Sequence, residues 1–292
     1  MPLTQGPPGI LLLEDGREFQ GRLAGAAPAT GELVFTTNMT GYQEVLTDPS
    51  FAGQIVVMTA PMMGNYGVNP ADVQSARPRV AGFVVRELRE SVRSWRAATS
   101  LSDYLAAHGV AVLDGVDTRA VTRHIRSLGA MRALIAPASI DRGEARAVLL
   151  AEPEMRGRDL ASEVGTREPY TVEPAGPAAG EVVCLDLGVK RRSLELIAAE
   201  GFLVRVVPGN TSAPDILARQ PAGLFVSNGP GDPEAVPDAP ATLRTVAEAG
   251  VPVFGICLGC QLVARAWGGH TFKLPYGHRG GNHPVRNLDT GA

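Results

Sequence analysis

The chain has 292 residues, of which 45% are hydrophobic, and it carries a formal net charge of −3 and three cysteines. Its length allows two domains with cores of ordinary size, and the slightly acidic balance argues against a nucleic-acid partner. No apolar run reaches the roughly 18 residues of a membrane helix, and the N-terminus lacks the features of a signal peptide. Three cysteines are too few for a disulfide scaffold, so we expect a soluble cytoplasmic protein with no membrane contact.

Residues 1–165 alternate short β-branched apolar runs with amphipathic segments, which predicts an α+β domain. The pair Asp15-Gly16 suits a tight turn, so the first two runs should form a hairpin. Further strands are predicted at 32–37, 54–59 and 80–88, a strand, helix and strand follow over 110–136, and other helices are predicted at 100–109 and 141–164. The polar stretch before residue 54 predicts a surface loop, and it contains Ser50.

Residues 166–180 are dense in proline, glycine and alanine, so they cannot bury enough surface to fold. We place a linker there, between a first domain of residues 1–165 and a second of residues 181–292. In the second domain, continuous apolar strands alternate with helices, which predicts a parallel sheet covered on both faces. Sites form beyond the carboxyl ends of such strands, where two loops emerge: residues 227–233 and the turn that contains Cys257.

The stretch VPVFGICLGCQLVARAW predicts a strand, a sharp turn and a helix, with Cys257 at the turn. Gly255 and Gly259 flank the cysteine at two residues on either side, which is the small-neighbour arrangement of a nucleophile elbow. The positive end of the helix dipole favours a thiolate, so we expect the pKa of Cys257 to lie below the ordinary value for cysteine. Cys257 is therefore the candidate nucleophile.

The loop SNGPGDP places Gly229 and Gly231 around a proline, so its backbone can approach a ligand closely. Alone, this pattern is also typical of an ordinary tight turn. Beside a cysteine nucleophile it suggests more, because acyl transfer needs N–H donors aimed at a developing oxyanion. The backbone amides of Leu258 and Gly229 are the candidates.

The C-x-x-C spacing from Cys257 to Cys260 leaves a second interpretation open, that of a thioredoxin-like redox pair. The bracketing glycines and the second glycine loop count against it, because a dithiol exchanger requires neither. A zinc site is weaker still, because this pair and Cys184 in an apolar strand do not make a tetrahedral ligand set. Cys184 is expected to be a small core residue.

The segments GICLGCQ, SNGPGDP and GHRGGNHPV resemble the class I, triad-type glutamine amidotransferase domain. Four N-terminal segments, LEDGREFQG, MTGYQEVLTDPS, GNYGVN and DTRAVTRHIR, resemble the small, glutaminase subunit of carbamoyl-phosphate synthase. The resemblance implies an α/β fold, with an N-terminal α+β domain and a parallel-sheet amidotransferase domain. It also implies glutamine hydrolysis through a cysteinyl thioester. Ammonia would pass through an internal tunnel to a large, ATP-dependent subunit, which makes carbamoyl phosphate for arginine and pyrimidine synthesis.

Positions that match the family's motifs imply roles for individual residues. Cys257 takes the place of the nucleophile, and the oxyanion donors fall on Leu258 and Gly229. The positions that bind glutamine fall on Ser50, Gly229, Gly231, Leu258 and Gln261. The resemblance implies no metal or organic cofactor in this chain, with ATP and Mg on the large subunit. The large subunit and glutamine are the expected partners.

The sequence departs from the family pattern at two places. Where the family ordinarily has histidine, three residues after the nucleophile, this chain has Cys260, which suggests a reversible disulfide with Cys257. The family's base and its carboxylate come from a His-x-Glu motif, which does not occur after Cys257; the resemblance gives His270, His278 and His283 places near the site but not the base role. We therefore expect an incomplete form of a normal subunit, whose second domain lacks its C-terminal part. A catalytically inactive supporting subunit and a redox C-x-x-C protein are the alternatives.

Overall fold

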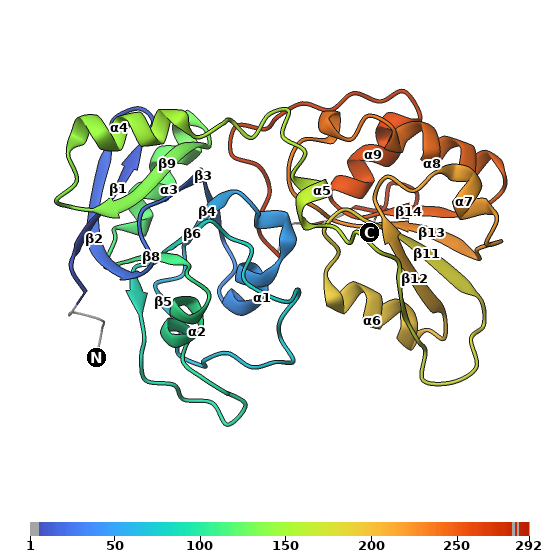
Figure 1. Cartoon of the computed structure of the whole chain (residues 1–292), viewed down its shortest axis with the longest axis horizontal. Coiled ribbons are helices and arrows are strands. Elements are labelled where there is room, and N and C mark those ends of the chain that lie inside the picture. The colour runs from blue at the N-terminus through green and yellow to red at the C-terminus, as the bar shows by residue number, and fades with distance from the viewer. Residues whose placement is uncertain (1–5, 282–283, 285, 292) are drawn as a thin grey trace.

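The structure is a computed structural model that describes residues 6–281, 284 and 286–291. Two bodies share the chain (Figure 1): a β-barrel with its helices, blue to green, and an open sheet with helices on both faces, yellow to red. This confirms an α/β protein in which an N-terminal α+β domain precedes a largely parallel sheet. Within the described residues, none of the helices is long and apolar enough to cross a membrane.

The first body is built around a closed barrel in which hydrogen-bonded neighbours follow the order β1-β2-β8-β6-β4-β3-β9. Its strands are β1 (Pro8–Leu13), β2 (Glu18–Gly25), β3 (Ala29–Thr36), β4 (Gln54–Met58), β6 (Gly82–Val84), β8 (Ala111–Asp114) and β9 (Met131–Pro137). The hairpin of β1 and β2 turns at Asp15-Gly16, as predicted, with Gly16 at φ 89°, where an L side chain would be strained.

Alternate residues of the strands fill the barrel. Leu11, Leu33 and Ile55, from three different strands, belong to one buried cluster, and Ile125 of helix α3 (Thr118–Leu128) joins it. Other helices cover the outside. They are α1 (Tyr42–Thr47) and α2 (Leu101–Ala107), which share a second cluster, and α4 (Arg142–Ala151), which packs on β1 and β9.

Helix α1 lies in the stretch that was predicted to be a surface loop. Tyr42, Val45 and Leu46 recur at helical spacing and are buried, so the segment is part of the core. The short 3-10 helix η1 (Pro49–Phe51) follows directly and carries Ser50. The residue implied as a glutamine contact is therefore held by packed structure and not by a free loop.

Two predicted elements of the first body are divided in the structure. The strand expected at 80–88 is interrupted and becomes β6 and the short β7 (Glu87–Leu88), which pairs with β5 (Met62–Met63). The helix expected at 141–164 becomes α4 and α5 (Leu160–Val164), because Pro153 cannot continue a helix.

The second body is a five-stranded sheet in the order β10-β12-β11-β13-β14. Its strands are β10 (Tyr170–Val172), β11 (Glu181–Asp186), β12 (Leu203–Pro208), β13 (Gly223–Val226) and β14 (Val253–Gly255). Neighbours pair in parallel except β10, which runs antiparallel to β12. The helices between and after the strands are α6 (Arg191–Ala199), α7 (Ala213–Leu217), η2 (Pro233–Ala235), α8 (Ala239–Glu248) and α9 (Leu258–Ala266).

Helices cover both faces of this sheet (Figure 1). On one face, α6 packs Leu194 against Cys184 and Phe225. On the other face, α7, α8 and α9 share a buried cluster with Val183 and Val226. The predicted covering of the sheet is confirmed, and Cys184 is a core residue.

Residues begin to pack in the core of the second body before the predicted linker at 166–180. Ala161 of α5 belongs to the core of the second body, and the N–H of Thr166 donates to Oδ2 of Asp186 at 2.8 Å. Within the predicted linker, β10 adds a strand through backbone pairing, which requires few buried side chains. The boundary between the two cores therefore lies between α4 and α5.

The loops that follow β11 and α9 return to the barrel body. The N–H of Arg191 donates to the carbonyl oxygen of Gln74 at 2.9 Å, at the start of α6. After α9, the hydroxyl of Thr36 donates to the carbonyl oxygen of Arg279 at 2.6 Å. The carboxyl ends of the sheet therefore face the barrel.

Candidate active site

Cys257 lies in the turn between β14 and α9, in a backbone conformation of φ 52° and ψ −113° that few L residues adopt. The flanking glycines make this turn possible. A Cβ on Gly259 would lie 2.2 Å from the carbonyl oxygen of Val226, and one on Gly255 would lie 2.5 Å from the carbonyl carbon of Gly259. The backbones of β13, β14 and α9 thus meet at a separation that only glycine permits, which confirms the predicted elbow.

Two backbone N–H groups are directed at the Cys257 sulfur, those of Leu258 and Gly229. Leu258 is the first residue of α9, so its N–H is one of the unpaired donors of a helix N-terminus. Gly229 comes from the loop after β13, where a Cβ would lie 2.2 Å from the carbonyl oxygen of Leu187. The two residues predicted as oxyanion donors therefore converge on the cysteine from different elements.

The prediction that the pKa of Cys257 lies below the ordinary value is wrong. Burial raises the pKa of this thiol, and the carboxylate of Asp48 raises it further. The N–H groups of Leu258 and Gly229 and the ammonium of Lys190 lower the pKa, but by less. The helix N-terminus lowers the pKa as expected, but burial of the sulfur raises the pKa by more. Part of the residue stays exposed, so a ligand has access to the thiol.

Ser227 fixes the glycine loop against its neighbours. Its hydroxyl accepts the N–H of Leu187 at 2.9 Å and donates to the carbonyl oxygen of Asn228 at 2.7 Å. Its carbonyl oxygen accepts the N–H of Gly259 at 3.1 Å. One buried residue therefore links the loops after β11 and β13 to the first turn of α9, which sets both N–H donors relative to the sulfur.

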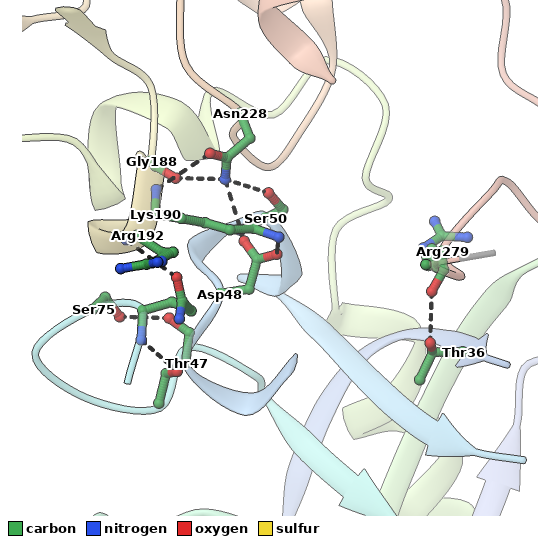
Figure 2. A network of polar contacts seen from close by, with 12 residues as sticks. Thr36, Thr47, Asp48, Ser50, Ser75, Gly188, Lys190, Arg192, Asn228 and Arg279 are labelled. Carbon is green, nitrogen blue, oxygen red and sulfur yellow. Dashed lines mark hydrogen bonds and ion pairs between the residues drawn. The ribbon is translucent and has the colours of Figure 1, made fainter. Parts of the chain in front are cut away.

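Asn228 connects the glycine loop to the barrel body (Figure 2). Its Nδ2 donates to Oγ of Ser50 at 2.9 Å and to the carbonyl oxygen of Gly188 at 2.8 Å, and it lies 3.3 Å from Oδ1 of Asp48. The ammonium of Lys190 forms an ion pair with Oδ2 of Asp48 at 2.7 Å. This network crosses between the two bodies, and it brings Ser50 to the loop that faces the cysteine.

Asp48, Lys190 and Asn228 were not predicted as site residues. Asp48 is only 6% exposed, and its Oδ1 accepts the N–H of Ser50 at 2.9 Å. A signal for two of them was present, because Asp48 and Asn228 lie in the same motifs as Ser50 and Gly229. Lys190 had no such signal, since its place depends on how β11 is positioned against the barrel.

The structure places Gly231 in the loop after β13 and Gln261 in α9, the two elements that carry the predicted oxyanion donors. Gly231 has φ 90°, and a Cβ there would lie 2.8 Å from the carbonyl oxygen of Arg158, so this loop conformation requires glycine. Gln261 lies one turn after Cys257 in α9, where its N–H donates to the Cys257 carbonyl oxygen at 3.1 Å and its side chain is exposed.

The predicted histidine positions fall in the segment after α9. His270 and His278 are both exposed, whereas His283 lies outside the described residues. The printed sequence contains no His-x-Glu segment that would assign a base among them.

The same segment carries Arg279, which the sequence did not mark as a site residue. Burial lowers the pKa of its guanidinium, while the charges of Glu32 and Cys257 raise it. One guanidinium nitrogen lies 3.7 Å from a carboxylate oxygen of Glu32, and Figure 2 shows the backbone contact with Thr36 that holds the segment on the barrel. A cation of this segment therefore lies within electrostatic reach of the cysteine.

Comparisons with known proteins cover both bodies. Residues 11–135 match the family model described as carbamoyl-phosphate synthase small chain, CPSase domain, and residues 183–291 match the one described as glutamine amidotransferase class-I. The carbamoyl phosphate synthase small chain of Syntrophotalea carbinolica is 46% identical over 295 residues, which is 97% of this chain and 78% of the relative. That of Streptomyces coelicolor is 48% identical over 287 residues, 97% of this chain and 76% of the relative. That of Symbiobacterium thermophilum is 48% identical over 285 residues, 96% of this chain and 78% of the relative.

Proposed function

The chain belongs to the carbamoyl phosphate synthase small chain family, and we propose that it hydrolyses glutamine with Cys257 as the nucleophile. One observation carries the proposal: the N–H groups of Leu258 and Gly229 converge on the sulfur of a cysteine held in a strained turn. Donors placed in this way stabilise the negative charge that develops on a carbonyl oxygen during acyl transfer. The chain is thus the glutaminase subunit of a glutamine-hydrolysing carbamoyl phosphate synthase.

In the proposed reaction, the deprotonated sulfur of Cys257 attacks the side-chain carboxamide carbon of glutamine. The carbonyl oxygen becomes an oxyanion and accepts hydrogen bonds from the N–H groups of Leu258 and Gly229. Each such bond lowers the activation free energy by about 3 kcal/mol. The C–N bond then breaks, the nitrogen takes a proton and leaves as ammonia, and the acyl group stays on the sulfur as a thioester. Water hydrolyses the thioester to glutamate and restores the thiol.

We propose that glutamine binds where the two bodies meet, at Ser50, Gly231 and Gln261 together with the oxyanion donors. The hydroxyl of Ser50 accepts a hydrogen bond from Asn228, so its own O–H remains available as a donor to a ligand. The exposed side chain of Gln261 lies on the same helix turn as the nucleophile. The barrel body would in this way contribute directly to substrate binding.

The small chain implies a large-chain partner, to which we propose that the ammonia passes directly for carbamoyl phosphate synthesis. We further propose that ATP and Mg bind to that large subunit and that this chain needs no metal or organic cofactor. A cytoplasmic location stays a prediction from the sequence, as do the arginine and pyrimidine pathways as destinations of the product.

The test is Cys257→Ser in complex with the large subunit, assayed with glutamine and, separately, with ammonia as the nitrogen source. We expect carbamoyl phosphate synthesis from glutamine to be lost and synthesis from ammonia to persist. Loss of both activities would mean that the cysteine is structural, and retention of both would remove it from the reaction.

A second candidate left open by the sequence is a supporting subunit without glutaminase activity. The unsubstituted chain distinguishes the two in the same assay. A supporting subunit would sustain synthesis from ammonia only, whereas the proposed glutaminase also releases glutamate from glutamine.

A further inference from the structure

Cys260 has no part in the proposed reaction, yet it lies exposed in the first turn of the helix that the nucleophile caps. Cys257, Cys260, Gln261 and Ala264, spaced i, i+3, i+4 and i+7, are all exposed. Both cysteines are free thiols. Both cysteine residues therefore have a part that a small oxidant can reach, although burial of the Cys257 thiol raises its pKa.

The start of α9 brings the two cysteines within disulfide range. Cys257 is the N-cap residue and its carbonyl oxygen accepts the N–H of Gln261, so Cys260 is the third residue of the helix. Residues three apart at a helix start have Cα atoms about 5 Å apart, inside the roughly 4.4–6.8 Å that disulfides span. The Cα–Cβ bond of Cys260 tilts toward the helix N-terminus, and hence toward Cys257.

We propose that Cys260 is a resolving cysteine, which forms a disulfide with Cys257 when a peroxide oxidises the nucleophile and so silences the site reversibly. As a switch for activity this rests on the proposed function, because the blocked group is its nucleophile. The structural basis of the proposal is that both exposed cysteines lie at the start of the same helix. The disulfide can therefore form without movement of another described element.

The chemistry balances with hydrogen peroxide as the oxidant. The sulfur of Cys257 attacks one peroxide oxygen, the O–O bond breaks, one water leaves, and a sulfenic acid results. The sulfur of Cys260 then attacks the sulfur of Cys257, the S–O bond breaks, and a second water leaves. Two thiols have lost two electrons, and one peroxide has become two waters. A dithiol such as dithiothreitol reverses the bond by exchange.

The chain contains its own control thiol. Cys184 is fully buried, and burial raises its pKa well above the ordinary value, so it should not react in the folded protein. Cleavage after lysine and arginine places it in the peptide 168–190, while Cys257 and Cys260 fall together in the peptide 245–265. The state of each thiol is therefore measured in a separate peptide.

The experiment exposes the 292-residue chain to hydrogen peroxide, alkylates it with iodoacetamide in denaturant, digests it and weighs the peptides. We expect peptide 245–265 to have lost two hydrogens and to carry no alkyl group, while peptide 168–190 is alkylated. After dithiothreitol, both cysteines of peptide 245–265 should be alkylated, and glutamine hydrolysis should return with them.

Cys260→Ser is the matched variant. Without the resolving thiol, peroxide should carry Cys257 to sulfinic acid, which dithiothreitol does not reduce. The proposal is overturned if the unsubstituted chain shows Cys260 alkylated while Cys257 is oxidised beyond sulfenic acid. The peptide masses do not depend on enzymatic turnover. If the chain hydrolyses no glutamine before oxidation, the proposed function is wrong, but the masses still show whether the disulfide forms.

Discussion

The network at Asn228 gives a prediction whose size follows from the structure. The substitution Asn228→Ala removes the side-chain amide that donates to Oγ of Ser50 in the barrel body and to the carbonyl oxygen of Gly188 in the second body. An amide nitrogen carries two hydrogens, so these two bonds, at 2.9 and 2.8 Å, are the ones made at full strength. The third acceptor, Asp48, lies at 3.3 Å and keeps its ion pair with Lys190.

Each of these two shorter bonds contributes a net of about 1 kcal/mol to stability, and the buried carbonyl of Gly188 left without this donor costs about 1 kcal/mol more. The longer bond from the N–H of Lys190 to Oδ1 of Asn228, at 3.3 Å, is lost as well and is counted as negligible. The expected loss in the free energy of unfolding is therefore about 3 kcal/mol, close to 100-fold in the ratio of folded to unfolded protein. Because the same amide positions Ser50, the KM for glutamine should rise as well.

Urea unfolding followed by far-ultraviolet circular dichroism measures this loss, since both tryptophans are exposed and report weakly on burial. The matched control is Asn210→Ala, at an exposed turn position, which should change stability by less than about 0.5 kcal/mol. If Asn228→Ala also stays within about 0.5 kcal/mol, the network does not hold the bodies together and the reasoning from its geometry is refuted.

Two further predictions concern the elbow and its charge. Gly259→Ala would place a Cβ 2.2 Å from the carbonyl oxygen of Val226, so both oxyanion donors should shift. The kcat for glutamine should then fall about 100-fold, whereas Gly176→Ala, which meets nothing within 4 Å, should leave it unchanged. Alkylation of Cys257 by iodoacetamide should rise only at a pH above that of an ordinary thiol, because burial raises its pKa. Asp48→Asn removes a charge that disfavours the thiolate and should shift this profile to lower pH; an unshifted profile would contradict the electrostatic account.

The parts of the fold that rest on local pattern were predictable, and those that rest on long-range pairing were not. The first hairpin and the strands of the second sheet follow from turn residues and unbroken apolar runs. The closed barrel depends on pairs such as Leu11 with Ile135, which lie far apart in the sequence. Helix α1 escaped prediction because polar Gln43 is buried through hydrogen bonds to the backbone of Asn69, and no local signal shows that these bonds exist.

The same division separates the parts of the site. Cys257 and its two glycines were predictable because the requirement for a strained turn is steric and local. The placement of Leu258 and Gly229 follows from the order of parallel strands, which apolar runs indicate. Ser50 was found only through resemblance, because nothing in its own stretch shows which loop of the other body it will meet.

The pKa of Cys257 shows why local reasoning failed at the chemistry while it succeeded at the geometry. The helix N-terminus lowers the pKa through groups adjacent in sequence, but burial and Asp48 raise it through groups that only the assembled bodies bring near. Removal of Asp48 would cost stability, because one of its carboxylate oxygens pairs with the ammonium of Lys190 and the other accepts the backbone N–H of Ser50. The carboxylate that holds the backbone of Ser50 is thus, after burial, one of the causes that raise the pKa of Cys257.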